Sequence, residues 1–325
     1  MKGEASWMAG VNEIRAMGRV VMDNVEKVIV GKRQVVQLLL AALLAEGHVL
    51  IEDVPGVGKT MMARAMAASL GCSFRRIQFT PDLLPQDVTG VSVFNQKTGE
   101  FQYRPGPVMA NILLADEVNR ATPRTQSSLL EAMEEKQVTV DGVTYRLNRP
   151  FLVVATQNPV EYEGTFPLPE AQLDRFTLRI RIGYPEAPDE ANMLARIAHG
   201  HPIEKVEPVL DASQVAGLQE ATREVYVEDS VRDYIVRIVA STRTHPDVTL
   251  GASPRGSIAL LKSAQALAAL EGRDFVIPDD IKTLAPYALT HRLVLRPESR
   301  LRGATPEKVV EDIIRSVPVP VEGPL

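Results

Sequence analysis

The residues with the clearest capacity for chemistry form a glycine-rich loop, Glu52–Thr60, directly after the apolar run Val49–Ile51. The loop ends in Gly58, Lys59 and Thr60, which fit the end of the pattern G-x-x-x-x-G-K-[ST]. Small residues let backbone N–H groups converge on phosphate oxygens, and the start of the following helix favours an anion. A lysine at this position reaches the outer phosphates, and the threonine hydroxyl binds Mg²⁺. The spacing predicts a phosphate-binding loop between a strand and a helix.

Asp53 departs from this pattern, because the first position of such a loop is normally glycine. Aspartate tolerates a positive φ angle better than most residues. We therefore interpret Asp53 as a tolerated variation in the first turn of the loop. The alternative, a glycine-rich loop that arises by chance, is disfavoured by the strand–loop–helix context.

Two adjacent carboxylates, Asp116 and Glu117, follow a second apolar run, Ile112–Ala115. Asp116 would hold Mg²⁺ through water, and Glu117 would orient and polarise an attacking water molecule. By themselves the two residues fit the acidic first turn of a helix equally well. Their presence in one chain with Lys59 and Thr60 favours the catalytic interpretation.

Asn158 follows a third apolar run and precedes a proline. Its amide could hydrogen-bond a terminal phosphate or the attacking water, although Asn-Pro is also a common start of a turn. Arg175 and Arg255 are the candidates for contacting charge in the transition state, because arginine is always ionised and donates in a planar fork. The alternative for either arginine is an ordinary surface ion pair, for which Asp174 could serve as the partner of Arg175.

The elements that must position these residues alternate between strands and helices. Such alternation predicts a parallel sheet that is covered by helices on both faces. The predicted strands are Val49–Ile51, Phe74–Phe79, Asn111–Ala115, Phe151–Thr156 and Thr177–Ile182. The predicted helices cover residues 11–46 with a break at Val30–Gly31, then Thr60–Leu70 and Thr125–Lys136.

Two hairpins interrupt the alternation. Residues 91–94 and 100–103 flank one turn, and residues 137–140 and 143–147 flank the pair Asp141-Gly142, a strong signal for a type I′ turn. After residue 184 the sequence becomes mainly helical, so we predict an α/β core with N-terminal helices over 1–184 and a helical domain over 185–325. The helices expected there are 189–199, 211–223, 228–243, 254–270 and 278–289, with an irregular tail at 316–325.

Length and composition indicate an ordinary folded chain of about two domains, with 325 residues that are 45% hydrophobic and 24% charged. The net charge of −5 disfavours a protein that depends on nucleic-acid backbone contacts. The single cysteine, Cys72, excludes an intrachain disulfide, and the five histidines lack metal-ligand spacing. No apolar run approaches the ~18 residues of a membrane span, and residues 1–13 lack a signal-peptide core. We therefore expect a cytoplasmic protein without a transmembrane segment.

Taken in order, these motifs resemble those of the MoxR-type AAA+ ATPases, in the helix-2-insert clade, from about Val28 to Pro318. The most specific stretches are residues 78–90, 116–142, 156–176 and 252–257. The resemblance implies a three-layer αβα core with a parallel sheet of strand order 5-1-4-3-2. It also implies two β-hairpin inserts, at the helix-2 and pre-sensor-1 positions, and an all-α lid.

The resemblance also assigns site residues. It implies that ATP is bound by Pro55, Gly56, Val57, Gly58, Lys59, Thr60 and Met61, with adenine near Gly31. Thr60 and Asp116 would hold Mg²⁺, Asp116 and Glu117 would form Walker B, and Asn158 would be sensor 1. Arg175 would be an arginine finger that acts on the nucleotide of a neighbouring subunit. Arg255 would be sensor 2, acting within its own subunit or across the interface.

The function implied by the resemblance is that of a Mg²⁺-dependent ATPase in a homo-oligomer, usually a hexameric ring. Members act as chaperones that remodel or mature partner proteins, often ones with a von Willebrand factor A domain, and metal or cofactor insertion recurs among them. A DNA-remodelling ATPase is the alternative, but the acidic hairpin tip Val140–Val143 lacks the cations that grip phosphates, so no nucleic acid is expected. A nucleotide sensor without turnover is disfavoured by Glu117 and Asn158.

Overall fold

The computed structural model describes residues 10–159, 164–198 and 200–320. Three sequence predictions extend beyond these residues. They concern His199 with the end of the predicted helix 189–199, residues 160–163 of the motif 156–176, and the last five residues of the tail.

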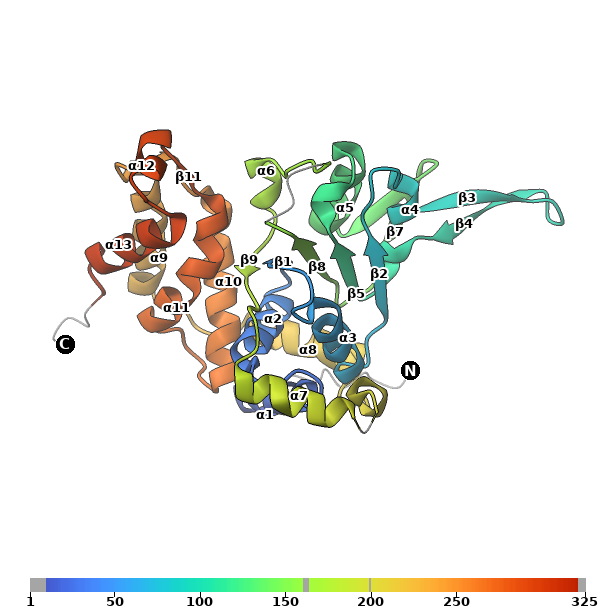
Figure 1. The fold of residues 1–325 in the computed structure, drawn as a ribbon, viewed down its shortest axis with the longest axis horizontal. Coiled ribbons are helices and arrows are strands. Elements are labelled where there is room, and N and C mark those ends of the chain that lie inside the picture. Colours follow the sequence, from blue (N-terminus) through green and yellow to red (C-terminus); the bar gives the residue numbers. More distant parts are fainter. Residues whose placement is uncertain (1–9, 160–163, 199, 321–325) are drawn as a thin grey trace, which may run out of the picture.

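A five-stranded parallel sheet forms the centre of the α/β part (Figure 1). Its strands are β1 (Val49–Glu52), β2 (Phe74–Gln78), β5 (Ile112–Asp116), β8 (Leu152–Gln157) and β9 (Leu178–Ile180). The spatial order is β2-β5-β8-β1-β9. Numbered within the core alone, this is the predicted order 5-1-4-3-2. The apolar runs form strands because both of their faces are buried, as is typical of parallel sheets.

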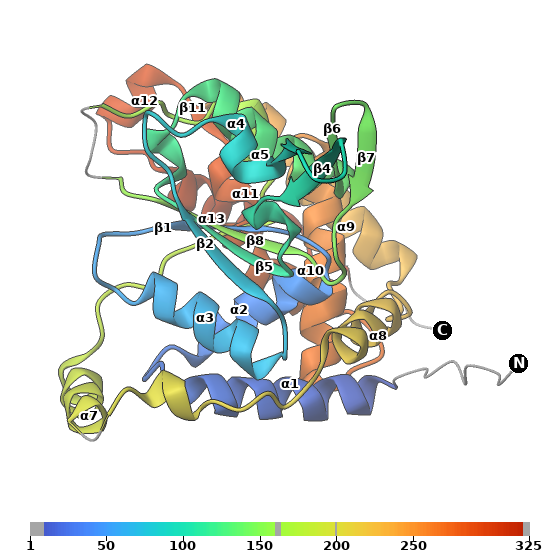
Figure 2. The ribbon, with the colours of Figure 1, turned by 90° about the vertical axis from the view of Figure 1, so that its right-hand side faces the viewer.

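Helices cover both faces of this sheet, which gives three layers (Figure 2). One face packs on α2 (Arg33–Leu44) and α3 (Lys59–Ser69), with α1 (Val11–Glu26) beneath these two helices, and the other face packs on α4 (Pro85–Thr89) and α5 (Pro123–Glu135). Side chains alternate between the layers with period two. In β8, for example, Leu152 and Val154 join the first hydrophobic cluster, whereas Val153 and Ala155 join the second.

The two predicted hairpins are present. One consists of β3 (Gly90–Asn95) and β4 (Glu100–Pro105), which extend away from the body of the molecule in Figure 1. The other consists of β6 (Gln137–Val140) and β7 (Val143–Arg146). Asp141 and Gly142 both have positive φ, 50° and 79°, as the predicted type I′ turn requires. The rings of Tyr103 and Tyr145 stack with their centroids 4.1 Å apart, so the two hairpins contact each other.

The segment after residue 184 is mainly helical, as predicted. Its helices are α7 (Ala187–Ile197), α8 (Ala212–Thr222), α9 (Asp229–Thr244), α10 (Pro254–Glu271), α11 (Pro278–Leu289), α12 (Pro297–Leu301) and α13 (Pro306–Ser316). It also contains a short antiparallel pair, β10 (Val248–Leu250) with β11 (Val294–Leu295), so the expectation of purely helical structure was wrong at this point. The remaining short elements are α6 (Glu170–Leu173) and 3₁₀ segments at 107–109, 118–120, 202–205 and 290–292.

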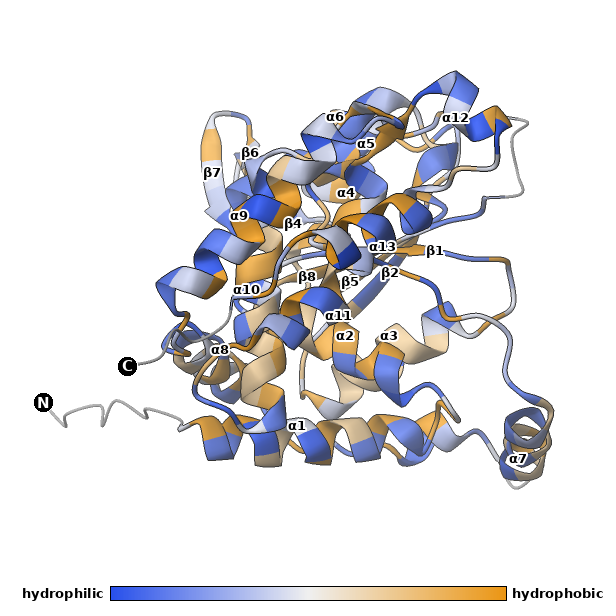
Figure 3. Ribbon diagram, turned by 90° about the vertical axis from the view of Figure 1, so that its left-hand side faces the viewer, coloured by the Kyte–Doolittle hydropathy of each residue, from blue (hydrophilic) through white to orange (hydrophobic). Residues whose placement is uncertain are grey.

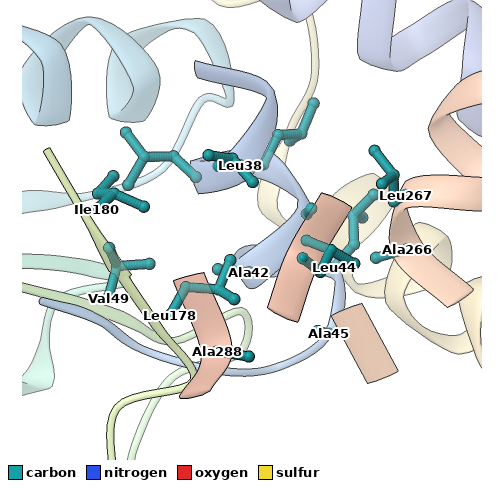
Figure 4. Packing of buried hydrophobic residues seen from close by; sticks show 14 of the residues in the cluster. Leu38, Ala42, Leu44, Ala45, Val49, Leu178, Ile180, Ala266, Leu267 and Ala288 are labelled. Atoms are coloured by element: carbon teal, nitrogen blue, oxygen red, sulfur yellow. The ribbon is translucent and has the colours of Figure 1, made fainter. Parts of the chain in front are cut away.

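The helical segment and the sheet share one hydrophobic cluster. Figure 4 shows side chains of α2, β1 and β9 packed together with Ala266 and Leu267 of α10 and Ala288 of α11. Helix α10 also packs along α1, where an added Cβ at Gly18 would lie 2.5 Å from Leu270 Cδ2. In Figure 3, α1 alternates hydrophobic and hydrophilic positions, as expected for a helix with one buried face. The predicted boundary at residues 184 and 185 stays a prediction.

Candidate active site

The predicted phosphate loop connects β1 to α3, and its helix begins at Lys59. Gly56 and Gly58 have φ angles of 85° and 87°, in the left-handed region that glycine adopts without strain. An added Cβ at either position would meet open space, so the backbone conformation is what requires glycine here. The Lys59 ammonium donates a 2.6 Å hydrogen bond to the carbonyl oxygen of Asp53. The strand–loop–helix arrangement is therefore present, with the lysine folded back over the loop.

The structure does not support the interpretation of Asp53 as a residue that tolerates a positive φ angle in the first turn of the loop. Asp53 is not among the described non-glycine residues with positive φ, so tolerance of that conformation does not explain it. The residue is 8% exposed, and its carboxylate accepts hydrogen bonds from the backbone N–H groups of Val54, Ile182 and Gly183, at 2.7–2.8 Å. The carboxylate thus joins the loop to the chain that follows β9.

A cavity of about 530 Å³ opens beside this loop. Part of its wall is formed by residues of the loop and the first turn of α3, namely Pro55, Gly56, Val57, Gly58 and Met61. The lining also includes residues 28–30 with Lys32, residues 183–185, and residues of α7, which Figure 2 places on the same side of the molecule as the loop. A mostly apolar hollow next to a glycine-rich loop has the size of a site for a small ligand.

Gly31 lies at the edge of this cavity rather than among the residues that line it. Its φ is 70°, and an added Cβ would overlap Oδ2 of Asp189 at 1.8 Å. The glycine therefore permits close contact between the α1–α2 connection and α7. Its neighbours Val30 and Lys32 line the cavity instead.

Asp116 and Glu117 occupy the carboxyl end of β5, where neighbouring strands hold both carboxylates. Asp116 accepts hydrogen bonds from the Thr156 hydroxyl (2.6 Å) and from the Arg76 guanidinium (2.6 Å). Glu117 accepts from the Gln78 amide (2.8 Å) and from Arg120 (2.9 Å). Asp116 belongs to the strand, and Glu117 has a left-handed φ of 55° before a 3₁₀ turn, so the pair does not form the first turn of an α-helix.

Thr156 is a site residue that the sequence motifs did not single out. Besides its bond to Asp116, its hydroxyl oxygen accepts the backbone N–H of Glu117 at 2.9 Å. It lies in β8, two residues before Asn158, which is buried after the strand end. Because β8 lies between β5 and β1, the carboxyl ends of the three strands bring Asp116, Asn158 and the loop to one edge of the sheet.

Arg175 and Arg255 come together elsewhere, on the carboxylate of Glu134. Arg175 Nη2 lies 3.1 Å from Glu134 Oε2, and Arg255 pairs with the other oxygen. Both arginines line a second cavity of about 390 Å³, and neither is among the residues lining the cavity beside the loop. Asp174, the partner suggested from sequence for Arg175, instead binds the buried Arg292 (2.8 Å) and the Ser253 hydroxyl (2.7 Å).

Two buried histidines support this second region. His48 Nδ1 accepts the N–H of Val153 at 3.0 Å, so its Nε2–H donates to the carbonyl of Met133 at 3.1 Å. Burial lowers the pKa of His48 to about 4. Burial and the neighbouring Arg292 guanidinium also hold the pKa of His291 well below its ordinary value. Both rings are therefore neutral near pH 7.

Two further features can be read from the residues that the structure describes. None of the described helices has the length and apolar character required to cross a membrane. Over the same residues there is no group of three or more histidine, cysteine, aspartate or glutamate side chains arranged to hold a metal ion. Cys72 is half-buried, and burial followed by the nearby Asp211 raises the pKa of its thiol to about 11, which makes it a poor nucleophile.

The chain matches two family descriptions. Residues 48–178 match the ATPase family associated with various cellular activities (AAA), and residues 240–313 match the AAA lid domain. Together with the parallel sheet, the phosphate loop and the helical segment, these matches define an AAA+ ATPase with a helical lid.

Individual relatives show to which family of AAA+ ATPases the chain belongs. The chain is 60% identical to the protein YeaC of Bacillus subtilis, over 93% of this chain and 94% of the relative. It is 41% identical to the chaperone MoxR1 of Mycobacterium tuberculosis, over 95% of this chain and 83% of the relative. A crystal structure from Cytophaga hutchinsonii, described as an ATPase, superposes with a TM-score of 0.90 at 39% identity and covers 96% of this chain and 97% of its own. The chain belongs to the MoxR family.

Proposed function

We propose that this protein hydrolyses ATP with Mg²⁺ and uses the energy as a chaperone on other proteins. The observation that carries the proposal is the meeting of three strand ends at one sheet edge, where the loop with Lys59 and Thr60 lies near Asp116 and Glu117. A loop of this kind binds the phosphates, and paired carboxylates beside it serve hydrolysis. The cavity beside the loop would hold the rest of the nucleotide.

The residues present fit a magnesium ion. Mg²⁺ prefers one or two protein oxygen ligands together with phosphate oxygens and water. The Thr60 hydroxyl and the Asp116 carboxylate supply such oxygens, and Thr156 and Arg76 hold Asp116 in place. When bound, the ion neutralises charge on the outer phosphates. Thr60 would accordingly bind the ion directly, and Asp116 would hold it through water.

The remaining roles follow from position. Residues 55–61 would hold the phosphates, and Lys59 would exchange its bond to the Asp53 carbonyl for one to the nucleotide. Glu117 would orient and polarise the attacking water, with Asn158 nearby as a further hydrogen-bonding group. Gly31 would act by letting α7 close on the adenine side. Each of these roles belongs to a residue whose position is fixed by the edge of the sheet or by neighbouring residues.

Arg175 and Arg255 would act on the nucleotide of a neighbouring subunit. Their pairing on Glu134, outside the cavity beside their own loop, supports an action in trans for both. Such an arrangement requires a homo-oligomer, for which we propose a hexameric ring. Light scattering of Glu117→Gln with ATP tests this proposal. We expect a particle with a mass of about six times 35.6 kDa.

The test of the ATPase uses two variants and a control. Lys59→Ala removes the charge that faces the phosphates, so ATP binding and turnover should be lost together. Glu117→Gln keeps the shape of the side chain, so ATP should bind while hydrolysis falls by roughly 10²-fold or more. Lys97→Ala, on the exposed β3–β4 turn, serves as the matched control. Unchanged ATP affinity of Lys59→Ala by calorimetry would refute the proposed site.

The client can be tested with the same variants. MoxR1 of Mycobacterium tuberculosis is named a chaperone, and we propose a protein client with a von Willebrand factor A domain, with metal or cofactor insertion as the outcome. Glu117→Gln with ATP should retain such a protein in affinity capture, and Lys59→Ala should not. Equal recovery with both variants would contradict an ATP-dependent client.

A further inference from the structure

We propose that Asp53 is a positioning residue that fixes the phosphate loop relative to residues 183–185, which line the same nucleotide cavity. The proposal rests on the function proposed above, in which ATP occupies that cavity. Position 53 is where the loop pattern expects glycine. A glycine there would have no side chain and could make none of the three hydrogen bonds that the Asp53 carboxylate accepts.

The carboxylate forms a buried link between two segments that are far apart in sequence. Oδ1 accepts the N–H of Val54, within the loop, at 2.8 Å. Oδ2 accepts the N–H groups of Ile182 and Gly183, after β9, both at 2.7 Å. Hydrogen bonds to an ionised acceptor are about twice as strong as neutral ones. The link is therefore a strong attachment of the loop to the segment that follows β9.

The backbone of Asp53 extends the same network. Its N–H donates to the carbonyl of Gln157 at 3.2 Å, at the end of β8. Its own carbonyl accepts the Lys59 ammonium at 2.6 Å. One residue thus contacts the loop, the start of α3, the end of β8 and the chain after β9.

The segment held by Oδ2 leads directly into the cavity wall. Gly183, Tyr184 and Pro185 line the same cavity as Pro55–Gly58. The Lys32 ammonium donates to the Tyr184 carbonyl at 2.8 Å, which ties the α1–α2 connection to the same wall. Through Gly183, the position of this wall relative to the phosphate loop depends on Asp53.

In the proposed site a nucleotide contacts both segments at once, with its phosphates on the loop and its remaining part against residues 183–185. Inorganic tripolyphosphate needs only the loop. Loss of the Asp53 link should therefore weaken ATP much more than tripolyphosphate. A purely structural role would instead lower stability without separating the two ligands.

The experiment titrates ATP and tripolyphosphate, each with Mg²⁺, into the full-length protein by calorimetry. Asp53→Gly, which returns the glycine of the pattern, should bind ATP tenfold or more weakly and tripolyphosphate within about twofold of wild type. Asp53→Asn keeps one acceptor oxygen, so its affinity for ATP should lie between those of Asp53→Gly and wild type. Asp280→Ala is the matched control, because Asp280 is equally buried and accepts the N–H of Ile277 at 3.0 Å, but it is not among the residues lining the cavity.

Two results would overturn the proposal. One is wild-type ATP affinity in Asp53→Gly, and the other is an equal loss of both ligands, which would restrict Asp53 to shaping the loop. If Asp53→Gly does not fold, the binding of ATP and tripolyphosphate is compared on Asp53→Asn instead. We expect this variant to lose more affinity for ATP than for tripolyphosphate. Lys59→Ala separates the two proposals. It should lose both ligands, and unchanged binding there would refute the nucleotide site itself rather than the role of Asp53.

Discussion

The phosphate-loop cavity and the arginine cluster on Glu134 are built in opposite ways. The loop is held from within by a buried carboxylate and backbone N–H groups, with Asp53 only 8% exposed. The cluster consists of side-chain ion pairs that are partly open to solvent, with the Arg175 side chain 29% and the Arg255 side chain 44% exposed. The first region is fixed in place, whereas the second can change partners.

The difference in burial has an energetic meaning. Exposed ion pairs contribute at most about 1 kcal/mol, because water screens them and the side chains lose freedom. Arg175 and Arg255 can therefore leave Glu134 at little cost for a group with a stronger negative charge. A phosphate accepts arginine in the same forked geometry. Glu134 would accordingly hold the arginines until the nucleotide of a neighbour replaces it.

The largest effect should come from Arg175→Ala. A trans arginine finger contributes roughly 10³–10⁵ in rate in GTPases. We expect turnover to fall by about 10³-fold while ATP affinity stays near that of wild type, because Arg175 is not among the residues lining the cavity beside the loop. Steady-state ATPase assays and calorimetry measure the two effects separately.

Mixing this variant with Glu117→Gln sharpens the test. Both are expected to be inactive alone, but the mixture contains interfaces where an intact Glu117 faces an intact Arg175, so activity should return. A rate per subunit that stays constant down to a demonstrated monomer would exclude an action in trans.

A fall in pH is expected to have an intermediate effect, because it protonates His48 and lowers the free energy of unfolding. The ring of His48 holds the carbonyl of Met133, the residue before Glu134. Because the folded pKa of about 4 lies below the unfolded value of about 6.5, the contribution of neutral His48 is complete above pH 6.5 and declines as the pH falls toward 4. Between pH 7 and 5 the free energy of unfolding should fall by about 2 kcal/mol through this residue.

Urea unfolding of wild type and His48→Gln at these two pH values measures that contribution as a difference. Glutamine can still accept the Val153 N–H and donate to Met133, so the fold is retained. An equal loss of stability in both proteins would show that His48 does not carry the acid sensitivity of this region.

The smallest effect should come from Glu134→Gln. If Glu134 only holds the arginines, its neutralisation should change stability by less than about 1 kcal/mol and turnover by less than about fivefold. Glu311→Gln, which removes the exposed ion pair with Arg315 on α13, is the control. A tenfold fall in turnover of Glu134→Gln alone would mean that the carboxylate positions the arginines for catalysis. The arginine cluster would then be as fixed in its function as the phosphate loop.

The sequence was sufficient for the sheet and for the loop. Buried parallel strands read as continuous apolar runs, so β5 and β8 were apparent from residues 112–115 and 151–156, and the glycines with positive φ were at the expected loop positions. The order of the strands came from the family resemblance. These features depend on local sequence or on motif order, which a single chain displays directly.

The connections between elements could not be predicted in this way. Asp53 was interpreted through its own φ angle, although its partners, Ile182 and Gly183, lie beyond four other strands of the sheet in sequence. Asp174 is the neighbour in sequence that the alternative of a surface ion pair offers to Arg175, whereas the fold brings Arg175 to Glu134 on α5. Such contacts depend on tertiary packing, for which no local pattern carries a signal.

The packing of α1 against α10 has a consequence for the synthesis of the protein. The ribosome produces α1 more than two hundred residues before α10. Until then the apolar side of α1, with Ile14, Val21 and Val25, has only part of its final cover. Contacts of such long range slow folding and leave hydrophobic surface open to aggregation. The nascent chain is therefore expected to need protection until α10 has been synthesised.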